Sequence, residues 1–351
     1  MPNTKNESQS QKGYNTNLVL DALMTMKTAT RRQLAQRTGL SQPTVNSIVQ
    51  ELENKGFASP GTFAVSAGGR RPQCYTLQID HLRAATIRMI PHSMEYLIVS
   101  VDGTVVLRYS WPIADGDNHL TALKSLLRTL LKQDRNIRVV SIGVPGVVGP
   151  RGVLYAIPQI PELEGVALAR ELNEQFDLPI YVENDMNLVA LGSVVDESGQ
   201  NTLSDMVFVH LGQGVGAGIV MSGRIIRGFS SFAGEIAYMV KPFGDSNDDD
   251  TLEKLIAQAK SISQQATLIA RMIVSIICLL NPPVISFGST LASEDMLWHL
   301  RHECEKYLPM WTIPTFKVMQ DEEAAYDRGL IAMVDDVLTS QIIHELSTAQ
   351  I

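Results

Sequence analysis

A run of short polar side chains between Ser41 and Gln50 has the chemistry needed to read DNA. Asn and Gln amides can form two hydrogen bonds with adenine, and Ser and Thr hydroxyls bind base edges or phosphates. In SQPTVNSIVQ these groups alternate with apolar residues, so they share one face of a helix. The DNA contacts predicted on this face are Ser41, Gln42, Thr44, Asn46, Ser47 and Gln50.

Two short helices must hold that polar face in place. Apolar residues recur at steps of three, four and seven from Leu34 to Leu52, which predicts two helices that share a small core. Gly39 suits the sharp turn between them because glycine tolerates positive φ, and Ser41 suits the N-cap of the second helix. The pattern is typical of a helix-turn-helix whose second helix enters the major groove of DNA.

A basic loop follows the two helices. Residues 57–65 and 74–77 are typical of strands, and GGRRP between them contains Arg70 and Arg71, which suit a phosphate or a minor groove. Arg31 and Arg32 are also predicted to contact the DNA. We expect a winged helix-turn-helix domain over residues 15–78 after a disordered tail over residues 1–14. The alternative is an ordinary pair of helices with solvated loop charges.

Charge and hydropathy limit the classes of protein that fit. Residues 1–80 contain nine Lys and Arg against five Asp and Glu, whereas the whole chain has a net charge of -8. A basic head on an acidic body indicates that only the head binds double-stranded operator DNA. Residues 1–13 are too polar for a signal peptide, and the apolar run 266–280 contains Arg271 and is too short to span a bilayer. We expect a cytoplasmic protein with no membrane partner.

Strands alternate with helices after Leu77, which predicts an α/β body. The expected strands are residues 84–90, 95–101, 104–111, 138–143, 180–183, 207–211, 216–221, 224–226 and 284–287, and the expected helices are 119–133, 163–175, 250–259 and 264–280. Two series of three strands followed by a helix and a strand suggest two lobes with a cleft between them. We assign residues 79–190 to the first lobe, with the C-terminal helix as a candidate addition, and residues 191–351 to the second lobe and a dimerisation surface.

Five ordered motifs carry a family resemblance. They are IGVPGVV from Ile142, VENDMNLVALG from Val182, LGQGVGAGIV from Leu211, AGEIAYM from Ala233 and NPPVISFGS from Asn281. Together they resemble the ROK family of sugar kinases and sugar-responsive repressors, and the N-terminal domain resembles the repressor branch. The resemblance implies a two-lobed body with the actin/hexokinase-like fold of sugar kinases.

The resemblance also implies a set of ligand-binding residues. In ROK proteins an Asn-Asp pair and the Glu of an AGEIGH motif bind sugar hydroxyls, which points to Asn184, Asp185 and Glu235. Glu253 corresponds to a further ligand Glu of the family, and Gly146, Gln159 and Tyr238 fall on ligand-side motifs. Other readings stay open at this point: Asp185 as a helix N-cap, and Glu235 as an acid of a surface turn.

Departures from the family pattern argue against a sugar kinase. The family's first phosphate loop, DxGGT, is replaced by residues 88–92, RMIPH, which lack the acid and the glycines. Gln213 stands in the second phosphate loop where kinases usually have Thr, and Ser289 interrupts the Gly-Gly of the adenosine region. We therefore expect no enzymatic activity, although Asp185 matches the catalytic base of the kinases.

The family's zinc site is missing from the sequence as well. Tyr238 replaces the zinc-binding His, and no CxCGxxGC cluster follows, since Cys74, Cys278 and Cys304 are far apart. The acidic run 245–250 is best explained as a solvated loop. We expect neither a metal nor a cofactor, and the loss of the zinc-held His leaves open whether the ligand has changed or the ligand site is vestigial.

These features lead to one hypothesis and two alternatives. The leading hypothesis is a ROK-type transcriptional regulator, a repressor, that forms a homodimer or a tetramer and senses a sugar or sugar derivative. The first alternative is a sugar kinase that carries a DNA-binding head and phosphorylates a hexose with ATP. The second is a body that is captured by a partner protein in place of a sugar.

Overall fold

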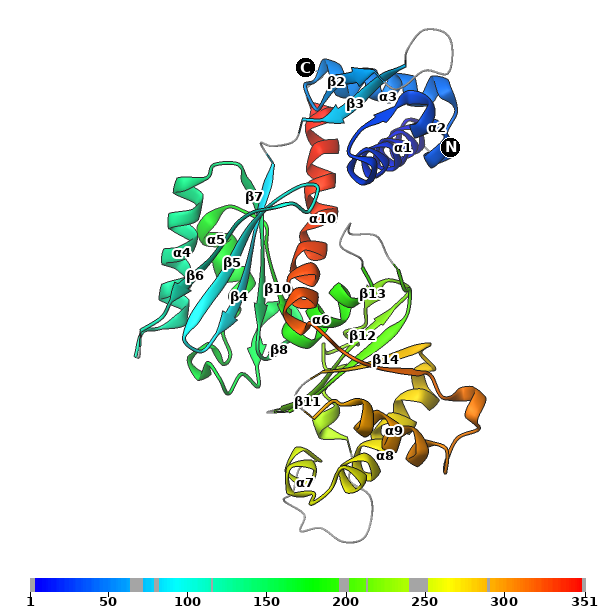
Figure 1. Cartoon of the computed structure of the whole chain (residues 1–351). Helices are drawn as coiled ribbons and strands as arrows, with labels where there is room; N and C mark the ends of the chain where they lie inside the picture. Colours follow the sequence, from blue (N-terminus) through cyan, green and yellow to red (C-terminus); the bar gives the residue numbers. More distant parts are fainter. Residues whose placement is uncertain are drawn as a thin grey trace.

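A small N-terminal domain is followed by two α/β lobes, and the last long helix connects all three (Figure 1). The computed structural model describes residues 4–63, 72–78, 82–114, 116–195, 202–212, 214–239, 252–288 and 291–348. We refer to the three parts as the head, the N-terminal lobe and the C-terminal lobe.

The head has the winged helix-turn-helix arrangement that the sequence predicts. Its elements are α1 (Thr4–Met26), β1 (Ala29–Thr30), α2 (Arg31–Thr38), α3 (Gln42–Asn54), β2 (Ala58–Phe63) and β3 (Gln73–Leu77), with the strand order β1-β3-β2. Gly39 ends α2 with φ 70, and Ser41 caps α3 by accepting a hydrogen bond from the Thr44 amide. Thr30 and Gln33 form a capping box at the start of α2. The turn and the N-cap inferred from sequence are therefore confirmed.

The first helix differs from the disordered tail expected over residues 1–14. In the structure α1 already begins at Thr4, and its second half buries Val19, Leu20 and Leu23 in the core of the head. Once that half is nucleated by packing, each further turn costs little because propagation is much cheaper than nucleation. The polar segment therefore extends a helix whose buried part lies downstream.

Both lobes contain a five-stranded sheet with one shared topology, a three-stranded antiparallel meander extended by two parallel strands. In the N-terminal lobe the strand order is β10-β7-β4-β5-β6, and in the C-terminal lobe it is β13-β12-β11-β14-β15. The predicted repeat of two α/β lobes is thus confirmed.

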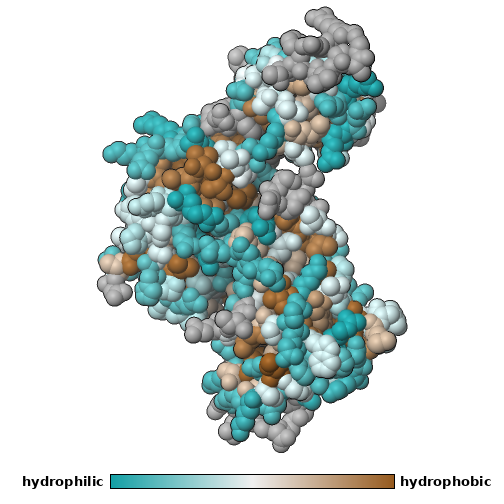
Figure 2. Space-filling view, in the orientation of Figure 1, coloured by the Kyte–Doolittle hydropathy of each residue, from teal (hydrophilic) through white to brown (hydrophobic). Residues whose placement is uncertain are grey.

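The N-terminal lobe holds the next elements of the chain. They are β4 (Arg83–Ile90), β5 (Ser93–Ser100), β6 (Val105–Pro112), α4 (His119–Gln133), β7 (Ile137–Val144), β8 (Val147–Val148), η1 (Pro150–Gly152), β9 (Leu154–Tyr155), η2 (Pro161–Leu163), α5 (Leu168–Phe176), β10 (Ile180–Asn184) and α6 (Asp185–Ser193). The helix expected from residue 163 begins five residues later because Gly165, at φ 76, turns the chain there. The edge strand β6 exposes Val105, Val106 and Leu107, and Figure 2 shows hydrophobic side chains gathered on this lobe.

The C-terminal lobe holds the remaining elements. They are β11 (Met206–Gly212), β12 (Gly214–Met221), β13 (Arg224–Ile225), η3 (Ile236–Tyr238), α7 (Leu252–Gln258), α8 (Ile262–Leu280), β14 (Val284–Gly288), α9 (Glu294–Cys304), η4 (Met310–Thr312), β15 (Thr315–Val318) and α10 (Glu322–Thr348). The helices α6 and α9 and the strand β15 were not predicted from the sequence, whereas α10 is the C-terminal helix that was expected as a candidate addition to the first lobe.

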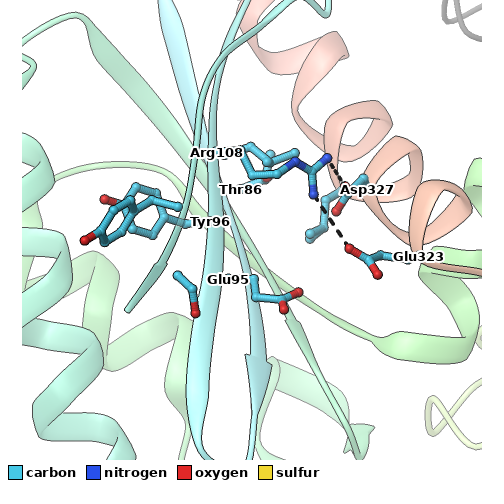
Figure 3. Close-up of a pocket in the computed structure, with 10 residues that line it drawn as sticks. Thr86, Glu95, Tyr96, Arg108, Glu323 and Asp327 are labelled. Carbon is cyan, nitrogen blue, oxygen red and sulfur yellow. Dashed lines mark hydrogen bonds and ion pairs between the residues drawn. The ribbon is translucent and has the colours of Figure 1, made fainter. Parts of the chain in front are cut away.

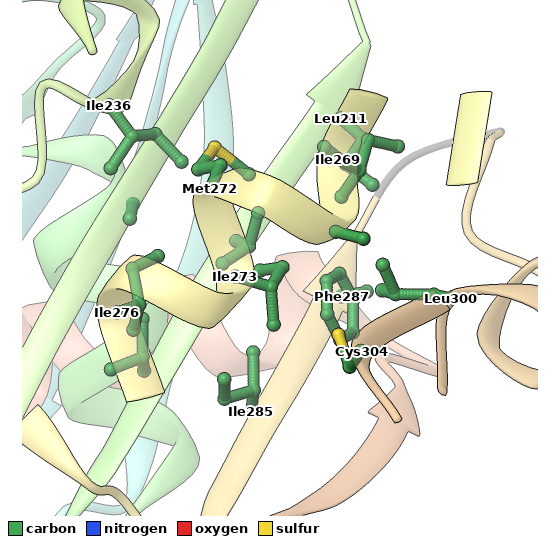
Figure 4. Close-up of a cluster of buried hydrophobic side chains, with 14 of the residues drawn as sticks. Leu211, Ile236, Ile269, Met272, Ile273, Ile276, Ile285, Phe287, Leu300 and Cys304 are labelled. Carbon is green, nitrogen blue, oxygen red and sulfur yellow. The ribbon is translucent and has the colours of Figure 1, made fainter. Parts of the chain in front are cut away.

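The helix α8 is apolar because one of its faces forms the core of the C-terminal lobe. It is 19 residues long, so by length and composition alone it would pass for a membrane span, contrary to the length argument made from the sequence. In the structure Ile269, Ile273 and Ile276 pack with Phe287 of the sheet and Leu300 of α9 (Figure 4). This packing accounts for its hydropathy.

A close crossing of α6 and α10 joins the two lobes. A Cβ atom at Gly192 would lie 1.7 Å from the carbonyl oxygen of Ala325, and one at Gly329 would lie 2.0 Å from that of Leu188. Only glycine permits this approach. On the other side of α10, the Ser141 hydroxyl of β7 donates a hydrogen bond to the carbonyl of Leu330 at 2.9 Å.

The same helix continues into the head. Val334 and Leu338 of α10 belong to one buried cluster with Leu20 and Leu23 of α1 and with Val99 of the N-terminal lobe. Figure 1 shows α10 running from the junction of the lobes to the head. The head is therefore fixed to the body by a shared hydrophobic core as well as by the chain connection.

The crossing predicts a contrast between two helical glycines. We expect Gly329→Ala to destabilise the protein by about 1–3 kcal/mol, because the added methyl group forces α6 and α10 apart. Gly13→Ala in α1 is the control, since a Cβ atom there meets nothing within 4 Å, and it should stabilise by about 0.5–1 kcal/mol. Thermal denaturation of both variants measures the contrast, and equal melting temperatures would show that the crossing tolerates a methyl group.

Candidate functional site

The outward face of α3 presents the polar side chains that the sequence singles out. Ser41, Gln42, Asn46, Ser47 and Gln50 are exposed, and Thr44 is half-buried. On the opposite face Val45, Ile48, Val49 and Leu52 are buried. The helix therefore offers one continuous polar surface to a partner.

Three members of this set already have partners within the head. The Ser41 and Thr44 hydroxyls are hydrogen-bonded to each other at 2.7 Å. The Gln50 amide donates to Asn54 Oδ1 at 3.1 Å and accepts from the Arg31 guanidinium at 3.3 Å. Among the described residues, this leaves Gln42, Asn46 and Ser47 as the exposed α3 side chains with uncommitted hydrogen-bonding groups, and they are the strongest candidates for base contacts.

Arg31 has a positioning role that the sequence did not suggest. Its guanidinium lies 4.8 Å from the centre of the Tyr75 ring and 3.6 Å from Glu53, so it joins α2 to α3 and to β3. Arg32 is exposed and remains a candidate for a phosphate contact. Arg70 and Arg71, the predicted wing residues, lie outside the described residues.

The second site lies at the junction of the lobes, where β10 leads into α6. Asn184 is the N-cap of α6, accepting a hydrogen bond from the Asn187 amide at 3.1 Å and donating one to the Gly146 carbonyl at 3.0 Å. The N-cap is thus Asn184 and not Asp185. Asn184 ties α6 to the loop after β7, and this is a structural task in addition to any ligand contact.

Asp185 and Glu235 bring two carboxylates to this junction from different lobes. Both are half-buried. Burial raises the pKa of Asp185 to about 6, and the charge of Glu235 adds to this shift. A hydrogen bond from the Met186 amide and the charges of His210 and Arg88 oppose it. Burial also raises the pKa of Glu235. The predicted pair therefore shares one electrostatic environment that disfavours ionisation in the absence of a ligand.

An ion pair between exposed Arg227 and buried Glu183 lies next to the Asn-Asp pair in the chain. Glu183 is 3% exposed, and its carboxylate accepts hydrogen bonds from the Arg227 guanidinium at 2.7 Å and from the Asn187 amide group at 2.9 Å. Arg227 belongs to the segment after β13, so this contact joins the two lobes beside the candidate site. The sequence analysis did not identify either residue, although Glu183 directly precedes the Asn-Asp pair.

The remaining predicted ligand residues are dispersed. Gly146 is buried against Ile157, and Gln159 is exposed. Tyr238 is 66% exposed, with its ring 5.2 Å from that of Phe232. Glu253 is engaged elsewhere, because its carboxylate accepts a hydrogen bond from the Gly214 amide at 2.8 Å. Its observed role is to hold the glycine-rich turn, because that turn exposes a backbone N–H that needs an acceptor.

The two positions that correspond to phosphate loops are unsuited to phosphate. Pro91 and His92 form a tight turn between β4 and β5, and buried His119 contacts the Pro91 carbonyl at 2.9 Å and Glu162 at 2.5 Å. At the second position the Gly214 amide is already bonded to Glu253, whose negative charge would repel a phosphate. Gln213 and Ser289 lie outside the described residues.

Arg88 takes the place of the acid in the first phosphate loop of kinases. Its guanidinium lies 4.8 Å from the centre of the Tyr326 ring and 3.6 Å from Glu95. Its positive charge lowers the pKa of Asp185. A guanidinium here disfavours the divalent cation that phosphoryl transfer needs.

Metal ligands do not gather in the described part of the chain. Among those residues no three His, Cys, Asp or Glu side chains lie together as a cation would require. The acidic run 245–250 lies outside the described residues.

A winged-helix head on a two-lobed body with a carboxylate pair at the lobe junction defines a class of proteins built on the sugar-kinase fold. The model of the ROK family matches residues 86–246, and a model of the MarR family matches residues 18–71. These matches show that residues 86–246 are similar to the ROK family and residues 18–71 to the MarR family.

Relatives with assigned names are repressors. The chain is 27% identical over 242 residues to a putative xylose repressor of Caldicellulosiruptor sp. (strain Rt8B.4), a match over 67% of this chain and 60% of that protein. It is 25% identical over 223 residues to the DNA-binding transcriptional dual regulator NagC of Escherichia coli (strain K12), over 61% of this chain and 54% of NagC. The chain thus matches little more than half the length of these relatives.

Solved structures share the fold. A ROK family transcriptional regulator, described as a homolog of the E. coli MLC protein, matches 95% of this chain and 99% of its own with a TM-score of 0.73 and 18% identity. A ROK hexokinase from Thermus thermophilus matches 73% of this chain and 100% of its own with a TM-score of 0.60 and 19% identity. The kinase match lacks an equivalent for about a quarter of the chain.

The raised pKa of Asp185 predicts a pH-dependent stability. The folded pKa of about 6 exceeds the ordinary value of 3.8, so folding takes up a proton between these pH values and stability falls as the pH rises through them. We expect Asp185→Asn to stabilise by on the order of 1–3 kcal/mol at neutral pH and by much less at about pH 3, below both pKa values, where both states hold the proton.

Melting temperatures of the two proteins across this pH range measure the effect. Asn can still accept the hydrogen bond from the Met186 amide, so the substitution isolates the charge. An Asp185→Asn stabilisation that is the same at both ends of the range would contradict the assigned ionisation.

Proposed function

We propose that this protein is a DNA-binding transcriptional regulator, a repressor, whose kinase-like body binds a sugar or sugar derivative and thereby controls operator binding. The proposal rests on one combination of features. The N-capped helix α3 exposes a polar face, and in the body contacts within the protein occupy both phosphate-loop positions. The names of the relatives, xylose repressor and NagC, support a role of this kind. The protein would act in the compartment that holds the DNA.

The head supports base recognition through α3. Gln42, Asn46 and Ser47 are exposed and carry amide and hydroxyl groups, which recognise base edges in the major groove. Arg31 fixes the angle between α2 and α3, and Arg32 is available for a phosphate. Arg70 and Arg71 are proposed to contact a phosphate or the minor groove from the wing.

The body supports ligand binding at the junction of the lobes. Asn184, Asp185 and Glu235 provide an amide and two carboxylates, which suit pairs of sugar hydroxyls. We include Gly146, Gln159 and Tyr238 at the margin of this site and give Glu253 the lesser, indirect role of holding the Gly214 turn. Two half-buried carboxylates with raised pKa values are unfavourable without a ligand, and hydroxyl donors would relieve this cost.

Control of the head by the body requires a mechanical connection, and α10 supplies one. It crosses α6 directly behind Asp185 and contributes Val334 and Leu338 to the core of the head. A ligand that changes the closure of the lobes would therefore move the head. In a homodimer two heads read half-sites about one DNA turn apart, so a small rotation of each head is enough to release DNA.

The surface of the C-terminal lobe supports self-association. Leu279 of α8, Trp298 of α9 and the adjacent Met310 and Trp311 of η4 are all exposed. Large exposed apolar side chains on neighbouring elements are typical of protein interfaces. We propose a homodimer formed through this lobe, with a tetramer as the alternative.

The proposed role of α3 predicts which substitutions change sequence preference. Asn46→Ala should reduce discrimination between the operator and an unrelated duplex by about 1–3 kcal/mol, because a bidentate amide contact with a base is lost. Gln36→Ala on the exposed face of α2 is the control, and it should leave discrimination unchanged. Genome-wide selection of bound DNA fragments, followed by competition binding, measures both. Unselective binding by the unmodified protein would remove the basis of the proposal.

The closed phosphate positions predict the absence of sugar phosphorylation. Incubation with ATP, Mg²⁺ and a panel of hexoses should give no sugar phosphate above the uncatalysed background. The relevant comparison is Arg88→Asp, which places an acid at the first phosphate-loop position. Turnover by the unmodified protein would favour the sugar-kinase alternative, and an absence of stabilisation by every sugar in a thermal-shift panel would favour capture of the body by a partner protein.

A further inference from the structure

We propose that the N-terminal lobe contains a second small-molecule site, separate from the carboxylate pair, that binds a small organic cation bearing a primary ammonium group. The site is a cavity between the β4–β5–β6 meander and the first turns of α10. Its volume is about 190 Å³. Asn184, Asp185 and Glu235 do not line this cavity, so it is distinct from the candidate sugar site.

The walls of the cavity come from a sheet edge and a helix. Thr86 of β4, Glu95, Tyr96 and Leu97 of β5, and Arg108, Tyr109 and Ser110 of β6 form one side, and Glu323, Asp327 and Leu330 of α10 form the other. Arg108 closes the space by reaching from β6 to Asp327 at 2.6 Å and Glu323 at 3.8 Å (Figure 3). The cavity exists because the meander extends beyond the cover that α10 provides.

Thr86, a residue of the cavity wall, has an unsatisfied polar group directly beneath the surface of the cavity. Thr86 is 1% exposed, and its hydroxyl has no hydrogen-bond partner among the described residues. A buried hydroxyl without a partner costs about 1–3 kcal/mol, whereas Val in its place would fill nearly the same volume at no such cost. The hydroxyl oxygen can accept a hydrogen bond from an ammonium group.

The charge of the lining favours a cation. Three carboxylates, Glu95, Glu323 and Asp327, face a single lining guanidinium, that of Arg108. Arg88 Nη1 lies 3.6 Å from Glu95 Oε2, and its positive charge only partly offsets the excess of negative charge. Burial raises the pKa of Asp327, and the contact with Arg108 opposes that shift. An ammonium group has three donors and no acceptor, and it matches a wall of acceptors.

The aromatic part of the lining suits the same class of ligand. The Tyr96 and Tyr109 rings are 5.9 Å apart and tilted by 50°, and together with Leu97 and Leu330 they supply an apolar surface. Tyrosine rings attract cations electrostatically, and a short alkyl chain gains from contact with the leucines. The cavity is smaller than the roughly 300–1,000 Å³ typical of drug-sized ligands, which restricts the occupant to a small amine.

Calorimetric titration of the full chain with 1,4-diaminobutane tests the site, with 1,4-butanediol as the neutral analogue of the same length and with ionic strength held constant by NaCl. We expect saturable binding of the diamine and none of the diol. Thr86→Val and Glu95→Gln should each weaken diamine binding by about tenfold or more, the effect of losing one strong contact. Glu174→Gln, which alters an exposed acid on α5, is the control and should bind as the unmodified protein does.

Thermal denaturation of the same variants separates binding from folding. Thr86→Val should melt at the same temperature as the unmodified protein or higher, because an unsatisfied hydroxyl is removed. Binding that is equal for diamine and diol, equal affinity in Thr86→Val and Glu95→Gln, or no saturable binding at millimolar diamine would each overturn the proposal.

Discussion

The crossing of α6 and α10 is the constraint on which the rest of the structure depends. Two glycines bring the helix backbones into contact between the lobes, and from Gly329 to Leu338 α10 rises by about 14 Å to reach the core of the head. One helix therefore packs against both sheets and the DNA-reading domain. Because packed interfaces shift between discrete arrangements, this packing supports the proposal that a change in lobe closure reaches the head along α10.

The lobe junction is bonded across both lobes, whereas contacts within the protein occupy the two positions that correspond to phosphate loops. A two-residue turn, held by His119, replaces a phosphate loop, and Glu253 occupies the Gly214 amide of the second loop. In contrast, Glu183, Arg227 and the Asn184 cap remain a fully bonded network across the lobes.

Local patterns predicted the head and most strands of the body, and long-range packing explains what they missed. Gly39, Ser41 and the apolar spacing of α3 act within a few residues, so the sequence alone identified them. The helix α6 was missed because it is buried between two sheets and lacks the amphipathic period of a surface helix. The carboxylate pair was found from a motif, but the roles of Arg31, Arg227 and Glu253 depend on partners that are distant in sequence.

The raised pKa of Asp185 favours the proposed ligand site over a vestigial one. A half-buried acid with a pKa of about 6 destabilises the folded protein at neutral pH, and an uncharged residue would fold more easily. A destabilising charge in such a setting is typical of binding sites, where stability is exchanged for affinity.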